Sequence, residues 1–252
     1  MQTLSKAKVK HFAALQQKKY RYLHRMFLVE GEKMVQEALA CGWPVEAVLV
    51  GPEQAARADM LADELPVWLV EKADFQRITS LEHPEGILAV LHMTGEAPLP
   101  PDTLPGPAFL LEDIQDPGNL GNLLRTADWL GLQAVVAGPG CADRFNPKAL
   151  RASMGSVLRV PYYETSDLAA LVQRHRDRVW VADMDGQSAP EVQFAAGDCL
   201  LLGNEARGIS PALRAVADLR RITIPRWGGA ESLNVATAGA MLGWQLRLQQ
   251  PR

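Results

Sequence analysis

Five prolines fall within fourteen residues, in the segment TGEAPLPPDTLPGP at 94–107. Proline fixes φ and removes a backbone donor, so neither a helix nor a central strand can run through such a segment. We therefore interpret 94–107 as a linker that divides the chain into a first region, 1–93, and a second region, 108–252. Both regions have the length of ordinary domains.

The first region alternates between helical and strand-like stretches. A basic helix is predicted over 5–17 and a second helix over 32–40, with Gly42 near its C-terminal end. Apolar runs bounded by glycine or proline follow at 45–50, 67–70 and 87–91. This alternation predicts a small α/β domain.

The second region repeats the alternation more regularly. Strands are predicted at 108–111, 134–137, 179–182, 199–202 and 221–224. Helices are predicted at 120–130, 148–154, 167–175 and 211–216, with a final helix after Leu233. The pattern indicates a parallel sheet covered by helices on both faces, in which ligands bind beyond the carboxyl ends of the strands.

Basic residues are concentrated at the start of the chain. Residues 1–29 hold seven of the 26 basic residues and no acidic one, although the whole chain has a formal charge of −3. The seven are Lys6, Lys8, Lys10, Lys18, Lys19, Arg21 and Arg25. Such a segment is either a patch that binds a polyanion or one solvated helix face, and charge alone leaves both open.

Several classes of protein are disfavoured by what the sequence lacks. No apolar run approaches the roughly 18 residues that span a bilayer, and the N-terminus lacks the apolar core of a secretory signal. We therefore expect a cytoplasmic protein without a membrane partner. The three cysteines and five histidines show no disulfide or zinc spacing, so no metal is expected. The dinucleotide, phosphate-loop and nucleophile-elbow motifs are also missing.

Three unusual loops follow predicted strands and mix glycines with charged or amide side chains. They are DIQDPGNLGNLLR at 113–125, GNEARGIS at 203–210 and IPRWGGAESLNV at 224–235. In the first loop, Asn119 fits either a helix cap or, together with Arg125, an anion site.

The other two loops also have two explanations. Glu205 and Arg207 fit either a local ion pair or a ligand-binding loop, whereas Ser210 before a proline is a natural helix N-cap. Ser232 is either an N-cap or, with Asn234, part of a site. Each loop taken alone leaves the choice open.

Taken together and in this order, the loops resemble the three motifs of the SpoU (TrmH) family of AdoMet-dependent RNA ribose 2′-O-methyltransferases, within the SPOUT superfamily. The matching segments are NLGNLLRTA at 119–127, LLLGNEARGIS at 200–210 and IPRWGGAESLNVATAGAM at 224–241. The segment 10–39 resembles the start of the substrate-binding domain that precedes the catalytic domain in many members. That likeness favours RNA as the partner of the basic segment, through Lys10, Lys18, Lys19, Arg21 and Arg25.

The resemblance implies a fold, a cofactor and an assembly. It implies a C-terminal parallel-sheet α/β domain tied in a deep trefoil knot, after a small N-terminal α/β RNA-binding domain. It also implies a homodimer in which the two knots complete each other's sites. AdoMet is expected to lie in the knot against Gly203, Ile224 and Leu233. Arg226 and Trp227 depart from the pattern, because members often have Met or a small residue there.

The resemblance also implies catalytic roles. The arginine that corresponds to Arg125 is the key catalytic group of the family. A guanidinium keeps its proton in proteins, so we expect Arg125 to hold a phosphate and stabilise negative charge rather than accept a proton. Asn119 is expected to orient RNA or Arg125, Glu205 to hold the loops or a partner's arginine, and Ser232 with Asn234 to shape the methyl-transfer site.

The predicted function is therefore methyl transfer from AdoMet to a ribose 2′-hydroxyl of structured RNA. The appended N-terminal domain favours ribosomal over transfer RNA. Three alternatives are a transfer RNA 2′-O-methyltransferase, a SPOUT enzyme that methylates a base, and a non-catalytic RNA-binding assembly factor.

Overall fold

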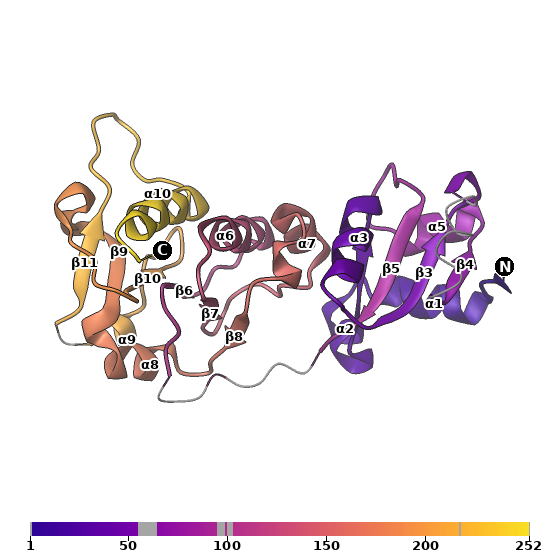
Figure 1. Ribbon diagram of the computed structural model, residues 1–252, viewed down its shortest axis with the longest axis horizontal. Coiled ribbons are helices and arrows are strands. Elements are labelled where there is room, and N and C mark those ends of the chain that lie inside the picture. The colour runs from indigo at the N-terminus through magenta and orange to yellow at the C-terminus, as the bar shows by residue number, and fades with distance from the viewer. Residues whose placement is uncertain (1, 55–64, 95–98, 100–102, 217, 252) are drawn as a thin grey trace. The chain divides into compact units, whose positions relative to one another are not determined.

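The computed structural model describes residues 2–54, 65–94, 99, 103–216 and 218–251. The chain forms two compact units (Figure 1). The first unit takes the chain up to residue 95 together with Phe145–Leu158, and the second takes the remainder. No described helix is long and apolar enough to cross a membrane.

The first unit contains a mixed five-stranded sheet. Its strands, in spatial order, are β1 (Gln2–Thr3), β4 (Val67–Leu69), β3 (Val45–Val50), β5 (Ile87–His92) and β2 (Met26–Glu30). β5 runs antiparallel to both of its neighbours, whereas β1, β4 and β3 run parallel to one another. The carboxyl ends of these strands therefore lie at both edges of the sheet.

Helices cover both faces of this sheet. The remaining described elements up to β5 are α1 (Lys6–Ala14), α2 (Lys18–His24), α3 (Glu32–Ala40), the short 3₁₀ helix η1 (Pro52–Gln54) and α5 (Lys72–Ile78). Phe12 of α1 and Phe75 of α5 are buried in one core with Leu49 and Val90 of the sheet. α3 begins and ends where the sequence predicts, and it buries Met34, Val35 and Ala38.

The segment Phe145–Leu158 belongs to the first unit although the sequence places it in the second region. It holds α7 (Pro147–Ser153) and the short turn η2 (Ser156–Leu158). The Phe145 ring lies 4.3 Å from the Phe27 ring of β2, and Trp43 donates its indole N–H to the Leu158 carbonyl over 3.0 Å. Aromatic packing of this kind depends on residues more than a hundred positions apart, which sequence periodicity does not report.

The second unit contains a six-stranded sheet that is parallel throughout. Its spatial order is β11 (Arg220–Thr223), β9 (Val179–Ser188), β10 (Cys199–Leu202), β6 (Ala108–Leu111), β7 (Ala134–Ala137) and β8 (Tyr162–Glu164). The chain moves outward from β6 to β8, then crosses over to β9 and returns to place β10 beside β6. The strand order thus reverses between β6 and β10, where open parallel sheets bind ligands.

Helices pack on both faces of the parallel sheet. α8 (Leu168–Arg174) and α9 (Pro211–Arg214) bury their apolar side chains with Leu110, Val136 and Leu201 on one face. α6 (Pro117–Leu130) and α10 (Val235–Leu248) lie side by side on the other face (Figure 1). Two short turns, η3 (Arg176–Arg178) and η4 (Ala189–Glu191), flank β9.

Two glycines let α10 approach its neighbours closely. A Cβ atom on Gly239 would lie 2.5 Å from Leu123 of α6, and one on Gly243 would lie 2.9 Å from Leu130 of the same helix. Both distances are shorter than van der Waals contact, so a larger residue at either position would force these leucine side chains to move, and glycine allows α10 to pack closely on α6.

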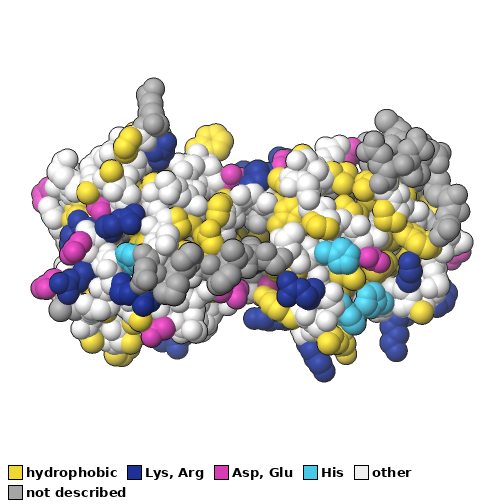
Figure 2. Space-filling model, turned by 60° about the horizontal axis from the view of Figure 1, so that its bottom comes forward, with side chains coloured by type: hydrophobic (Ala, Val, Ile, Leu, Met, Phe, Trp, Pro, Cys, Tyr) yellow, Lys and Arg dark blue, Asp and Glu magenta, His cyan; other side chains and the backbone are white. Residues whose placement is uncertain are grey.

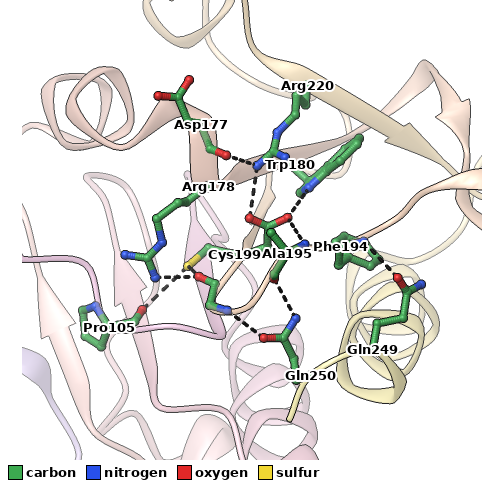
Figure 3. A network of polar contacts seen from close by, with 12 residues as sticks. Pro105, Asp177, Arg178, Trp180, Phe194, Ala195, Cys199, Arg220, Gln249 and Gln250 are labelled. Carbon is green, nitrogen blue, oxygen red and sulfur yellow. Dashed lines mark hydrogen bonds and ion pairs between the residues drawn. The ribbon is translucent and has the colours of Figure 1, made fainter.

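A buried polar network joins the C-terminal end of α10 to the amino-end side of this sheet (Figure 3). Asp198, which is fully buried, accepts from the indole N–H of Trp180 at 2.8 Å and pairs with Arg220 at 3.2 Å. Gln249 accepts from the Phe194 amide at 2.9 Å, and Gln250 accepts from the Gly197 amide at 2.7 Å. The network fixes α10, whose opposite end holds one of the three loops.

The predicted fold class is confirmed: a small α/β unit is followed by a parallel α/β sheet with helices on both faces. Three strands, β1, β2 and β8, were not predicted, and β9 extends to Ser188 instead of ending at 182. The predicted strand at 221–224 begins and ends one residue earlier, as β11.

The predicted linker is only partly described, because residues 95–98 and 100–102 lie outside the described residues. Its described part is not a free tether. Leu104 is buried in the core of the second unit with Leu99 packed against it, and Arg178 donates to the Leu104 carbonyl at 3.1 Å. An apolar leucine among prolines is thus part of the folded second unit.

Candidate functional site

The three loops singled out in the sequence lie at the carboxyl ends of β6, β10 and β11. β6 and β10 are neighbours in the sheet, and β9 separates β10 from β11. Since every strand of this sheet runs in the same direction, the loops that follow these strands emerge at one edge. The parallel topology brings residues 113–125, 203–210 and 224–235 to a common region.

One amide side chain joins all three loops. Asn119, in the first turn of α6, donates through Nδ2 to Oε1 of Glu205 and accepts through Oδ1 from Nδ2 of Asn234, at 2.9 Å in the second bond. Because the amide donates on one side and accepts on the other, its orientation is fixed. The structure thus brings together three of the predicted catalytic residues, which are 86 and 115 positions apart along the chain.

Neither Asn119 nor Ser232, which the sequence allowed as helix N-caps, caps a helix in the structure. Asp116, not Asn119, caps α6, and Pro117 occupies its first turn. Asn234, not Ser232, caps α10 by accepting from the amides of Ala236 and Thr237. Asn119 and Ser232 are therefore free of a capping role. The prediction for Ser210 is confirmed, because its side chain accepts from the Leu213 amide at 3.3 Å.

A second polar cluster supports the loop after β10. Arg207 pairs with Asp113, so the local ion pair between Glu205 and Arg207 that the sequence allowed does not form. Asn204 donates to Asp113 Oδ2 at 3.1 Å and accepts from the amides of Ala206 and Arg207. Asp113 and Asn204 were not singled out in the sequence, although each is the second residue after a predicted strand.

A cavity of about 430 Å³ lies beside these loops. Its walls include the three predicted cofactor-binding residues Gly203, Ile224 and Leu233, together with Glu205 and Ser232. A Cβ atom on Gly203 would lie 2.7 Å from the backbone of Gly208, so the backbone can take this path only with glycine. A cavity of this size with mostly apolar walls and few polar groups is typical of a small-molecule site.

Arg125 projects from α6 into solvent. Of the described residues, none forms a hydrogen bond or an ion pair with its guanidinium, and Arg125 is not among those that line the cavity. An exposed arginine without a partner retains all five of its donors for an external anion.

The predicted RNA-binding residues divide into two groups. Lys10, Lys18, Lys19 and Arg25 are exposed on α1, α2 and the residue that ends α2. Arg21 is a correction: it is 2% exposed, and its guanidinium donates to the carbonyls of Leu15 and Gln16 at 3.0 and 2.8 Å. It closes the end of α1 and is not available to RNA.

Aromatic rings accompany these basic side chains. The ammonium groups of Lys18 and Lys19 lie 5.5 and 5.7 Å from the ring centres of Tyr22 and Tyr20. The His11 ring lies 4.3 Å from the His24 ring, and Figure 2 shows Lys and Arg side chains near histidines on the surface of this unit. Burial, with a smaller effect from His24, lowers the pKa of His11.

Two of the three cysteines are kept as thiols by burial. Burial raises the pKa of the Cys141 thiol to about 11 and that of Cys199 to about 12, so neither is a thiolate near neutral pH. Within the described ranges, no group of three histidine, cysteine or carboxylate side chains is placed to hold a metal ion.

Comparison with known proteins gives two family matches. Residues 107–244 match the SpoU rRNA Methylase family, and residues 6–89 match the MRM3-like substrate binding domain. The first match alone spans more than half of the chain and contains all three loops.

Individual relatives agree with these matches. The chain is 37% identical over 243 residues to the 23S rRNA (guanosine(2553)-2′-O)-methyltransferase RlmP of Bacillus subtilis, covering 95% of this chain and 96% of the relative. A structure from Porphyromonas gingivalis, assigned to the TrmH family of RNA methyltransferases, has a TM-score of 0.84 at 36% identity and covers 98% and 99% of the two chains. The AdoMet complex of AviRb from Streptomyces viridochromogenes has a TM-score of 0.82 at 26% identity and covers 97% and 98%.

Proposed function

This chain belongs to the SpoU rRNA methylase family, and from that premise we propose that it transfers a methyl group from AdoMet to a ribose 2′-hydroxyl of ribosomal RNA. The observation that carries the proposal is the Asn119 side chain, which joins Glu205 and Asn234 beside the cavity. It connects the three family motifs in one arrangement. The ribosomal substrate is supported by the 23S rRNA relatives and by the substrate-binding domain.

The cavity fits AdoMet in size and chemistry. Gly203 brings bare backbone to the wall, and Ile224 and Leu233 supply apolar surface, which suits a flat adenine and a ribose held by main-chain groups. Bound AdoMet supplies an activated methyl group on a sulfonium. We assign Gly203, Ile224 and Leu233 to holding it.

The side chains around Asn119 are assigned to the receiving nucleotide. Methyl transfer needs the ribose hydroxyl aligned with the methyl group and its developing negative charge stabilised. Asn119 and Glu205 hold the loops in register. Ser232, in the cavity wall, and Asn234, which donates to Asn119, shape the methyl-transfer site. Arg125, which keeps its charge, binds an RNA phosphate and stabilises the charge on the oxygen.

We further propose that the protein acts as a homodimer with a knotted C-terminal domain. Four large apolar side chains are 48–85% exposed on the two neighbouring helices α6 and α10: Trp129, Met241, Trp244 and Leu248. Exposed apolar surface of this kind is typical of an association site. A second copy against these helices brings its own Arg125 toward the neighbouring cavity, which explains why Arg125 does not line the cavity of its own chain.

The two regions are assigned separate tasks. Residues 1–93 bind RNA through Lys10, Lys18, Lys19 and Arg25, residues 94–107 connect the regions, and residues 108–252 transfer the methyl group. The segment Phe145–Leu158 contributes to the first unit in addition. With ribosomal RNA as its substrate, the protein is proposed to act in the cytoplasm.

The test is transfer of labelled methyl from AdoMet to total RNA from cells that lack this gene, with naked RNA and ribosomal particles assayed in parallel. Alkaline hydrolysis then separates the products, because a 2′-O-methyl group blocks cleavage of the adjacent phosphodiester. Label in alkali-resistant dinucleotides of the ribosomal fraction is expected. Label only in mononucleotides would refute ribose methylation, label only in transfer RNA would refute the ribosomal substrate, and no label in either sample would favour a non-catalytic binding factor.

A further inference from the structure

The loop between β11 and α10 exposes a tryptophan that the proposed chemistry does not use. Residues 226–234 are all exposed, and Figure 1 shows this segment rising beyond both elements that it connects. Trp227 is 89% exposed. Tryptophan is among the more buried residues of folded proteins on average, so an indole left in water on one flank of a ligand cavity calls for an explanation.

Trp227 stands at the rim of the cavity assigned to AdoMet. It contributes to the cavity wall together with Arg226 and Ser232, while most of its ring remains in solvent. Arg226 donates to the Ala230 carbonyl at 3.1 Å and so closes a turn around Gly228 and Gly229. A Cβ atom on either glycine would meet nothing within 4 Å, so no described residue crowds the tip of the turn.

We propose that Trp227 is a stacking platform for an unpaired base of the RNA substrate, at the nucleotide that is methylated or beside it. The inference rests on the proposed function, because it requires the receiving ribose to enter this cavity. Proteins that recognise single-stranded RNA stack splayed bases on aromatic rings and place arginine beside them. Trp227 next to Arg226 provides that pair of groups, with the indole for a base and the guanidinium for a phosphate or a base face.

The position favours a base over other occupants. A ribose whose 2′-hydroxyl reaches the cavity carries its base on the next atom of the ring, so the base must lie within a few ångströms of the cavity rim. Among the described residues that line the cavity, Trp227 is the aromatic one. The exposed residues on α6 and α10 are assigned to the dimer, whereas Trp227 lies on the β11–α10 loop.

The test compares Trp227→Leu, which removes the aromatic face, with Trp227→Phe, which retains one. Fluorescence anisotropy measures binding of two labelled single strands of ten nucleotides, oligouridylate and an abasic strand with the same phosphates, both in saturating AdoMet. Wild type is expected to prefer the base-bearing strand. Trp227→Leu should lose about 5- to 160-fold of that preference, the range found for base–aromatic stacking, while Trp227→Phe keeps most of it.

Three results would overturn the proposal. An unchanged preference in Trp227→Leu would show that bases do not stack on this ring. If Trp227→Leu lost affinity for AdoMet, measured by isothermal titration, by the same factor as it lost its preference for bases, the indole would contact the cofactor and not a base. If the mass of Trp227→Leu in light scattering were half that of the wild-type dimer, Trp227 would be a dimer contact. Methyl transfer assayed on the same preparations tests the proposed function separately. A wild-type protein that stacks bases but methylates no ribose would refute that function and the placement of the base beside a methylated ribose, whereas the stacking on Trp227 would stand.

Discussion

The two units are built from similar elements, but their candidate functional residues lie in different places. In the second unit all six strands run in one direction, so the loops after β6, β10 and β11 meet at one edge and their side chains form a single bonded group around Asn119. In the first unit the antiparallel β5 sends strand ends to both edges of the sheet. Its basic side chains proposed to bind RNA lie on helix α1 and on α2 with the residue that ends it, as a charged surface.

This comparison teaches that direction of the strands decides whether loops can cooperate. In the second unit the candidate site lies at the carboxyl ends of the strands, where open parallel sheets bind ligands, whereas in the first unit the proposed RNA-binding residues lie on helices. Changes in the second unit should consequently alter turnover or the stability of the sheet. Changes in the first unit should alter the affinity for RNA.

The largest expected effect is that of Arg125→Ala. Removing a group that stabilises charge in the transition state costs about 10²–10³ in turnover. Because Arg125 is exposed and no described residue pairs with it, the unfolding temperature should stay at the wild-type value. Turnover is measured with saturating RNA, and melting is followed by circular dichroism. Near wild-type turnover in a folded dimer would show that the assignment of Arg125 is wrong.

Asp198→Ala should produce the largest loss of stability. The change leaves the Trp180 indole N–H and the Ala195 amide without an acceptor and Arg220 without its counter-charge, which costs about 3 kcal/mol. Urea unfolding monitored by tryptophan fluorescence measures the change in the free energy of unfolding.

The matched control for Asp198 is Asp74→Ala in the first unit. Asp74 pairs with Lys6 at 2.7 Å, but the Lys6 side chain is 78% exposed and can be solvated when the pair is lost. A smaller loss of stability is expected than for Asp198→Ala. Equal losses of unfolding free energy in the two variants would mean that burial of the Asp198 network does not make it more important for stability than the Asp74 pair.

The double change Lys18→Gln and Lys19→Gln should weaken RNA binding and leave turnover unchanged. Loss of two phosphate contacts is expected to raise KM roughly 3- to 10-fold and to reduce the slope of log affinity against log salt by about 2. Lys33→Gln is the control, because Lys33 is exposed in the same unit on α3. If the control weakens binding as much, the proposed RNA surface on α1 and α2 is misplaced.

The smallest expected effect is a pH dependence in the first unit. Since the folded state lowers the pKa of His11 from its ordinary 6.5, the unfolded chain takes up a proton first as the pH falls. The stability contributed by neutral His11 is complete above pH 6.5 and is lost as the pH drops below it. In His11→Gln the melting temperature should fall less between pH 7.5 and 5.5 than in the wild type. An equal fall in both proteins would contradict this assignment.

Local signals in the sequence were sufficient for most elements. The predicted helix over 32–40 coincides with α3, and the predicted strands at 108–111, 134–137 and 199–202 coincide with β6, β7 and β10. These segments are apolar runs or amphipathic stretches bounded by glycine or proline, so short-range preferences decide them. β8 was missed because Tyr162–Glu164 is only three residues long and pairs solely with β7.

The sequence by itself determined the family, through three motifs in fixed order. The tertiary structure decided which residues meet. It placed β10 beside β6, turned Asn119 toward both Glu205 and Asn234, and buried Arg21 against the carbonyls that end α1 while its basic neighbours stayed in solvent. Contacts across 86 and 115 positions depend on strand order and packing, and neither leaves a mark in local composition or periodicity.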